Sequence, residues 1–457
     1  MRSLLWRFFL WSGAALLTVA SSPAAEHPLM RDFIGICGHT VQFNPKLYSP
    51  IGHLVRDYHP VEWDLGGKAE KLPPFPLTAN GVDWEFVYGS WKTAGWETDA
   101  CLMFETIQEN ILKGKTSLLG DYAASLAKEF GPSSRRKLIQ SVEIGNEPGQ
   151  LSDACYREIF TTTAQAIRKA DPALRIATCA TTTGPSHRYA KSLDLFKDKT
   201  KLLDIITLHT YAQLENWPTW KRTFPEDPRL NHYIPDVENT IHWRDQYAPN
   251  KEIWITEYGY DSTTKQPDPK SDFAKWVGVT DTQQAQWIVR SCLLFSSLPI
   301  QRAYLYFFND EDQPMLHGSS GITRHFQPKP SFYALVHLQK TLGNYRFSKI
   351  LRQDSNGIWL FEYRDDSGHC AWVAWLASGS DAHREVTLGG IPGELLSCEE
   401  MPLSANPPSI TKPEPQDATI RLTVGESPTY LIFKTNEKKK QPESLSENRE
   451  NCRREGF

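Results

Sequence analysis

The sequence of 457 residues lacks a strong charge of either sign, because 54 acidic and 50 basic side chains leave a formal net charge of −4. This balance gives no electrostatic sign of a nucleic-acid partner, which usually meets a basic face. The eight cysteines form no CxxC pair, and this excludes zinc-ribbon and thioredoxin patterns. Beyond the first 25 residues, no apolar run is long enough to cross a bilayer. The composition therefore favours a soluble globular protein.

The amino-terminal residues have the layout of a secretory signal peptide. Arg2 and Arg7 mark a short basic start, an apolar run covers Phe8–Ala20, and small residues fill Ser21–Ala25. A membrane anchor is the alternative, but the run is short for a span of about 20 residues. We expect cleavage of this segment, no membrane attachment afterwards, and a secreted or periplasmic protein.

The cysteines are expected to serve packing rather than catalysis. Cys37, Cys101 and Cys179 lie in apolar runs, where a free cysteine behaves as a small buried hydrophobe. Cys370 and Cys398 could form a disulfide after export, and the sequence leaves that pairing open.

Short apolar runs alternate with helical patterns over residues 33–344. The runs are apolar almost throughout, as expected for parallel strands buried on both faces. The eight predicted strands are Phe33–His39, Leu54–His59, Asp99–Phe104, Ser141–Gly145, Arg175–Ala180, Asp204–His209, Glu252–Glu257 and Arg302–Phe307. The predicted helices include Leu118–Phe130, Asp153–Ala170, Thr282–Ser297 and Ser331–Leu342.

Eight strands alternating with helices predict an α/β fold, a (β/α)8 TIM barrel. An open, doubly wound sheet is the rival fold. That rival would favour a Gly-rich phosphate loop after the first strand, and Gly35–Thr40 (GICGHT) matches GxGxxG poorly.

The pattern changes after Asn344 to short runs that look like antiparallel strands, and these predict a C-terminal antiparallel β-sandwich. Its expected strands are Ile358–Arg364, Cys370–Leu376, Glu385–Leu388 and Thr429–Phe433, with a Pro-rich loop at Pro402–Pro415. The expected domain limits are a signal peptide at 1–25, a barrel at 26–345, a sandwich at 346–436 and a disordered charged tail at 437–457.

Two glutamates stand at the ends of predicted barrel strands, where the active sites of such barrels lie. Asn146 and Glu147 follow the fourth strand in GNEP, and Glu257 ends the seventh strand in ITEYG. Paired carboxylates at one barrel mouth suit glycoside hydrolysis, in which one protonates the leaving oxygen and the other meets the oxocarbenium-like centre. The alternative is that both are surface charges at the starts of loops.

These two motifs together resemble clan A of the glycoside hydrolases, including family 39 and its relatives. The resemblance covers about Phe33 to Asn344, and the β-domain that follows matches the accessory sandwich of several members. It implies a retaining enzyme with Glu147 as acid/base and Glu257 as nucleophile. It also implies that Asn146 binds the sugar 2-hydroxyl next to the scissile bond, and it implies no metal or organic cofactor.

Other strand ends supply candidates for binding the substrate. His209 and Tyr211 end the sixth strand, where clan members often place a His or Tyr that holds the nucleophile ionised. Arg56 on the second strand is a candidate partner of the nucleophile, because a buried Arg needs a carboxylate. His39, at the mouth of the first strand, is a candidate for binding sugar hydroxyls. A core histidine and a structural ion pair are the alternatives.

The eighth strand departs from the clan pattern. Many members place a Trp there as the floor of the sugar site, and here Tyr306, Phe308 or Asn309 would take its place.

Aromatic residues are abundant, with 15 Trp, 17 Tyr and 21 Phe making up 12% of the chain. The segment after the sixth strand contains Trp217, Trp220 and Trp243, which we expect to form one wall of the substrate cleft. Trp84, Trp91 and Trp96 have nearly helical spacing and are expected to pack in the core.

The sequence thus predicts an exported, retaining glycoside hydrolase that acts on an oligo- or polysaccharide. A transglycosylase with the same site is one alternative, and it would pass the sugar to a hydroxyl in place of water. A carbohydrate-binding barrel without catalysis is the other.

Overall fold

The computed structural model describes residues 26–72, 74–75, 78–354, 357–411, 413 and 418–435. The expected signal peptide (1–25) and charged tail (437–457) lie outside these residues.

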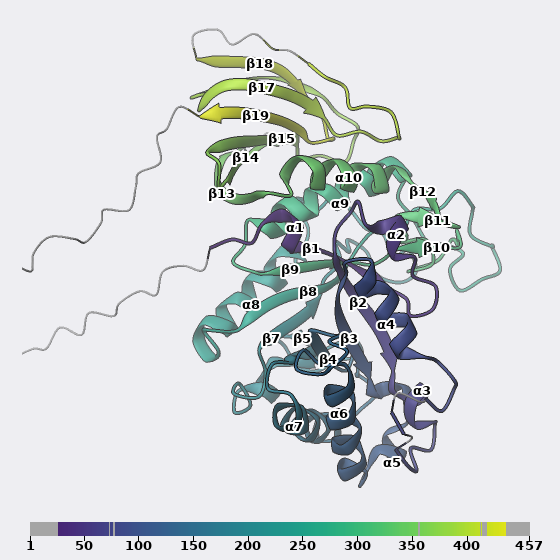
Figure 1. The fold of residues 1–457 in the computed structure, drawn as a ribbon. Coiled ribbons are helices and arrows are strands. Elements are labelled where there is room, and N and C mark those ends of the chain that lie inside the picture. The colour runs from purple at the N-terminus through teal and green to yellow at the C-terminus, as the bar shows by residue number, and fades with distance from the viewer. Residues whose placement is uncertain are drawn as a thin grey trace, which may run out of the picture.

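A closed barrel of eight parallel strands forms the first part of the chain (Figure 1). The strands pair in the order β4-β3-β2-β1-β9-β8-β7-β5, and pairing of β4 with β5 closes the ring. Their bounds are β1 Ile34–Gly38, β2 Leu54–Pro60, β3 Glu97–Met103, β4 Ser141–Ile144, β5 Arg175–Thr182, β7 Ile205–His209, β8 Glu252–Tyr258 and β9 Arg302–Leu305. All eight predicted barrel strands are confirmed.

Helices cover the outside of the barrel (Figure 1). The α-helices are α1 Met30–Phe33, α2 Pro45–Tyr48, α3 Val61–Leu65, α4 Trp84–Thr93, α5 Glu109–Leu112, α6 Thr116–Phe130, α7 Asp153–Ala170, α8 Ile234–Tyr247, α9 Asp281–Ser296 and α10 Pro330–Leu342. Short elements in the loops are η1 Phe104–Thr106, β6 Lys191–Ser192, η2 Leu193–Phe196, β10 Asn309–Asp310, β11 Thr323–Arg324 and β12 Gln327–Pro328. The predicted helices correspond to α6, α7, α9 and α10.

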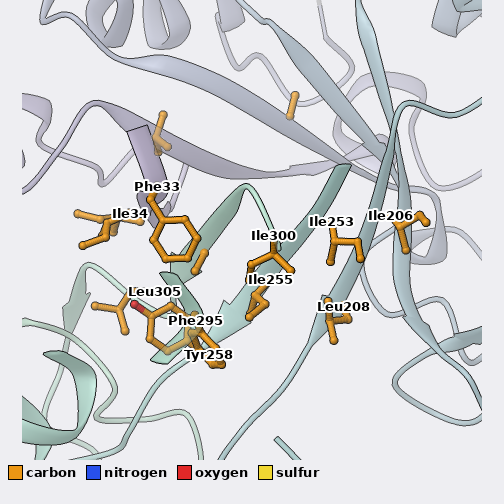
Figure 2. Packing of buried hydrophobic residues seen from close by; sticks show 14 of the residues in the cluster. Phe33, Ile34, Ile206, Leu208, Ile253, Ile255, Tyr258, Phe295, Ile300 and Leu305 are labelled. Carbon is orange, nitrogen blue, oxygen red and sulfur yellow. The ribbon is translucent and has the colours of Figure 1, made fainter. Parts of the chain in front are cut away.

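The hydrophobic core lies between the strands and these helices. Figure 2 shows Ile253 and Ile255 of β8 beside Ile206 and Leu208 of β7, and Phe295 of α9 against Tyr258. Side chains alternate along a strand, so the residues between these outward-facing ones in each strand face the barrel interior. A second cluster, which includes Cys37, Leu54, Trp254 and Tyr304, fills that interior.

The sandwich follows α10 and lies over α9 and α10 (Figure 1). One sheet has the order β13-β14-β15-β19-β17, and β16 pairs with β18. The bounds are β13 Tyr345–Gln353, β14 Ile358–Asp365, β15 His369–Leu376, β16 Arg384–Gly389, β17 Gly393–Glu400, β18 Thr419–Val424 and β19 Thr429–Thr435. The expected barrel limit, residue 345, is the first residue of β13.

The structure answers two questions of packing that the sequence raised, one about the cysteines and one about three tryptophans. The described cysteines are all buried and free, so Cys370 and Cys398 form no disulfide in this structure. Trp84, Trp91 and Trp96 are buried as expected, the first two on α4. No helix in the described part of the chain is both long and apolar enough to span a membrane.

Candidate active site

Glu147 and Glu257 meet at the mouth of the barrel. Glu147 lies just beyond β4, and Glu257 is the penultimate residue of β8. One oxygen of each carboxylate and one ring nitrogen of His209 all lie within 4.8 Å of one another. The side chain of Glu147 is 28% exposed, whereas that of Glu257 is 8% exposed, so only Glu147 has substantial access to solvent.

An irregularity in β8 turns Glu257 toward the interior. Trp254 faces inward and Ile255 outward, so regular alternation would also point residue 257 outward. The pairing of β8 with β9 shifts register between Ile255 and Tyr258, and Tyr258 then faces outward to Cys292 of α9. A bulge of this kind redirects a side chain at an active site.

Three donors hold the carboxylate of Glu257. Tyr58 and Arg56 donate to Oε1 at 2.7 and 3.1 Å, and Tyr211 donates to Oε2 at 2.8 Å. Burial acts to raise the pKa of Glu257, but the charges of His209 and Arg56 and the Tyr58 hydroxyl outweigh it and hold this pKa below its usual value. Burial raises the pKa of both phenols, so they remain protonated donors.

Arg56 links Glu257 to the segment that carries Glu147. Its Nε and Nη2 donate to Glu143 at 2.7 and 2.8 Å, and this ion pair is fully buried. Nη2 also donates to Oδ1 of Asn146 at 2.8 Å. That contact orients the Asn146 side chain, because it assigns the oxygen to Arg56 and leaves the amide N–H groups for another acceptor.

His209 lies between the two glutamates. Its Nδ1 is 2.9 Å from Oε1 of Glu147 and 3.5 Å from Oε2 of Glu257. Burial acts to lower the pKa of His209, but the negative charges of Glu257 and Glu147 outweigh it, so this pKa is raised. The sequence placed His209 beside the nucleophile, and the structure places it closest to Glu147.

Glu105, in η1 just after β3, anchors the segment that carries Glu147. Its Oε1 accepts from the backbone N–H of Asn146 at 2.7 Å and from that of Glu147 at 3.1 Å. Gln150 donates to the backbone oxygen of Glu105, which holds the far side of the same segment. Burial raises the pKa of Glu105 to about 7.

Two further rings lie beside the residues that hold Glu257. The ring of His317 lies 5.0 Å from that of Tyr211 and 5.3 Å from that of Tyr306. Nδ1 of His317 is buried without a hydrogen-bond partner. Tyr306 also faces Tyr58, with ring centroids 6.3 Å apart, which places it beside the residues that hold Glu257.

Not every predicted residue joins this cluster. His39 is half-buried, with Nδ1 unpartnered, and no contact joins it to either glutamate among the described residues. Asn309 is buried, and its Oδ1 accepts from Phe326 N and Thr323 Oγ1, so it fixes its own loop. Trp217 is 70% exposed and Trp220 half-buried, and their place in a cleft wall stays a prediction.

The expectation for Trp243 was wrong. This residue lies on α8 and is 7% exposed, in ring contact with Tyr247. The end of the segment after β7 is helical, and Trp243 faces the core rather than a cleft.

Sequence reasoning missed Tyr58, Glu105, Glu143 and His317 as site residues. Tyr58 had a usable signal, because it stands two positions after Arg56 and so points to the same side of β2. Glu105 had a weaker signal, since it closely follows a barrel strand. His317 lies on a loop without periodicity, and no pattern indicated it.

Glu147, His209 and Glu257 also have the ligand types and spacing of a metal site. The surroundings fit a cation poorly. Arg56 already places a positive charge on Glu257, and both oxygens of that carboxylate accept hydrogen bonds.

Comparison with known proteins identifies the fold. No family model and no curated protein matches the sequence. Among solved structures, a family 39 glycoside hydrolase from Bacteroides cellulosilyticus matches with a TM-score of 0.65 and 17% identity, over 89% of this chain and 81% of that one. The chain has the fold of clan A glycoside hydrolases.

Two other matches have the same architecture. A glucosidase from Croceicoccus marinus matches with a TM-score of 0.62 and 13% identity, over 89% of this chain and 96% of that one. A family 30 subfamily 8 xylanase from Clostridium acetobutylicum matches with a TM-score of 0.55 and 12% identity, over 90% of this chain and 97% of that one. The clan A resemblance seen in the sequence is therefore confirmed for the fold.

Proposed function

We propose that this protein is an exported, retaining glycoside hydrolase that cleaves O-glycosidic bonds in an oligo- or polysaccharide. The observation that carries the proposal is the contrast between two neighbouring carboxylates. Glu257 is buried and held ionised by Arg56, Tyr58 and Tyr211, whereas Glu147 is more exposed and has His209 as its side-chain partner. Carboxylates in contrasting environments divide the roles of nucleophile and acid.

The proposed reaction follows from these contacts. Glu147 gives its proton to the departing sugar oxygen while Glu257 attacks the anomeric carbon, and the bond between that carbon and the oxygen breaks. Glu147, now ionised, takes a proton from water, and the water displaces Glu257 from the sugar. The N–H groups of the Asn146 side chain, turned outward by Arg56, donate to the adjacent hydroxyl.

The separation of the carboxylates supports double displacement. Carboxyl groups about 5–5.5 Å apart favour retention, whereas about 6.5–9.5 Å leaves room for an attacking water. Glu147 and Glu257 present oxygens within 4.8 Å of one another, which favours retention of configuration at the anomeric carbon.

Export rests on the sequence of residues 1–25 alone. Mass spectrometry of the protein recovered from medium or periplasm tests it, since cleavage after Ala20 or Ala24 fixes the mature amino terminus.

A panel of aryl glycosides and polysaccharides tests the activity. The wild type should hydrolyse at least one member with retained configuration, seen by NMR of the first product. Glu257→Gln should abolish turnover without loss of folding, and Glu238→Gln, at an exposed position on α8, should leave it unchanged. Near-normal activity of Glu257→Gln, or sugar binding without turnover, contradicts hydrolysis. Transfer to added sugars in preference to water indicates the transglycosylase.

A further inference from the structure

A polar cavity of about 670 Å³ adjoins the acid/base residue. Glu147 is the one residue shared by this cavity and the cluster around Glu257. The other lining residues come from the segment that leads into α7, up to its first residue, and from the loop that leads into β6, up to Lys191. The loop contributes Ser186, Arg188 and Tyr189. The volume lies within the range of about 300–1,000 Å³ that small-molecule sites occupy.

Two close contacts fix the walls of this cavity. Lys191 is almost fully buried, and its Nζ donates to the backbone oxygen of Leu151 at 2.5 Å and to Asp153 at 3.1 Å. A Cβ at Gly149 would come within 2.0 Å of the backbone oxygen of Arg188, so only glycine permits this approach. The two loops are therefore held together beside Glu147.

The rim of the cavity presents an aromatic ring and a cation. Tyr189 is 46% exposed, and the guanidinium of Arg188 lies 5.5 Å from its ring centroid. Arg188 forms no ion pair with any residue that the structure describes. An exposed ring suits the apolar face of a sugar, and a free guanidinium offers donors for its hydroxyls.

We propose that this cavity is the leaving-group subsite and that it binds a sugar ring, stacked on Tyr189. The inference rests on the proposed function, which gives Glu147 the task of protonating the departing oxygen. The leaving group must then lie beside Glu147, and the cavity is lined by Glu147 but not by Glu257 or His209. The substrate is accordingly a glycan in which a sugar follows the cleaved bond, rather than a glycoside of a small alcohol.

A pair of substrates with the same glycone tests this subsite. A disaccharide fills the cavity with its leaving sugar, whereas the matching glycosyl fluoride leaves it empty and needs little acid assistance. Tyr189→Ala should lower kcat/KM for the disaccharide roughly tenfold, the loss expected for one aromatic contact. The same variant should keep kcat/KM for the fluoride within about twofold, which also shows that it folds.

Tyr247→Ala is the matched control. Tyr247 is 38% exposed at the end of α8, with Lys197 Nζ 4.6 Å from its ring, and it does not line the cavity. Tyr247→Ala should leave kcat/KM unchanged for both substrates. Equal effects of Tyr189→Ala on both substrates, or no effect on either, overturn the subsite. A wild type inactive on every fluoride, disaccharide, aryl glycoside and polysaccharide overturns the proposed function itself.

Discussion

Arg56 and Glu143 form a fully buried ion pair at the centre of the barrel, with Nε 2.7 Å from Oε1 and Nη2 2.8 Å from Oε2. The same guanidinium reaches Glu257 and Asn146. One side chain thus couples the stability of the barrel to the orientation of the proposed nucleophile.

Arg56→Met should cost both folding stability and activity. It leaves Glu143 as an unpaired buried carboxylate, so the free energy of unfolding should fall by about 3–5 kcal/mol. Urea unfolding measures this loss. The double variant Arg56→Met/Glu143→Gln removes both charges and should recover much of the stability but none of the activity. If the double variant is no more stable than Arg56→Met, the unpaired charge of Glu143 is not the cause of the lost stability.

Tyr58→Phe and Tyr211→Phe should each move the acidic limb of the kcat/KM profile to higher pH. Each hydroxyl donates to Glu257, whose pKa lies below the usual value. A hydrogen bond to a carboxylate favours its charged form, so losing either donor should raise the pH at which Glu257 ionises. A pH profile from about pH 2 to 7 measures the shift. Tyr363→Phe, whose hydroxyl bonds Ser296 at the sandwich interface, is the control. An unmoved acidic limb in both site variants contradicts the assignment.

Glu105→Gln should flatten the pH dependence of stability. Burial raises the pKa of Glu105 from 4.5 to about 7, so the folded state holds this proton more firmly than the unfolded state does. The contribution to stability is complete below the unfolded pKa and is lost as pH rises through the folded pKa. Urea unfolding at about pH 5 and pH 8 measures the free energy of unfolding at each pH. Between these two pH values it should fall less in the variant than in the wild type. An equal loss in both proteins means that Glu105 does not titrate in this range.

A chelator should leave activity unchanged. Glu147, His209 and Glu257 have the spacing of metal ligands, but the adjacent Arg56 charge and the two phenol donors disfavour a cation on Glu257. Hydrolysis assayed with and without EDTA checks this. Loss of activity that added Zn²⁺ restores would make the three residues a metal site.

The barrel could be predicted because its strands are buried on both faces and carry continuous apolar runs. The sandwich was predicted less completely. β13 (YRFSKILRQ) is an edge strand with much of its length exposed, so polar residues hide its pattern. β17 and β18 were missed as well, and β18 alternates buried and exposed residues over only six positions.

The glutamate pair could be predicted because strand ends meet at one face of a barrel. Its partners depend on side-chain direction and loop geometry, which sequence spacing does not fix. His317 reaches the site from a loop, and Trp243 turns into the core because α8 begins at Ile234. Asn309 follows a strand as Glu147 does, but Phe326 and Thr323 occupy its side chain.

Covalent labelling tests the central claim most directly. With a 2-deoxy-2-fluoro glycoside that carries an activated leaving group, both the formation and the hydrolysis of the glycosyl-enzyme are slowed. The hydrolysis is slowed more, so the glycosyl-enzyme accumulates. Mass spectrometry of the intact protein and of its peptides should then show one fluorosugar attached to Glu257, with inactivation in step with labelling. Labelling of a different residue, or hydrolysis of the parent glycoside with inverted configuration, would contradict the account.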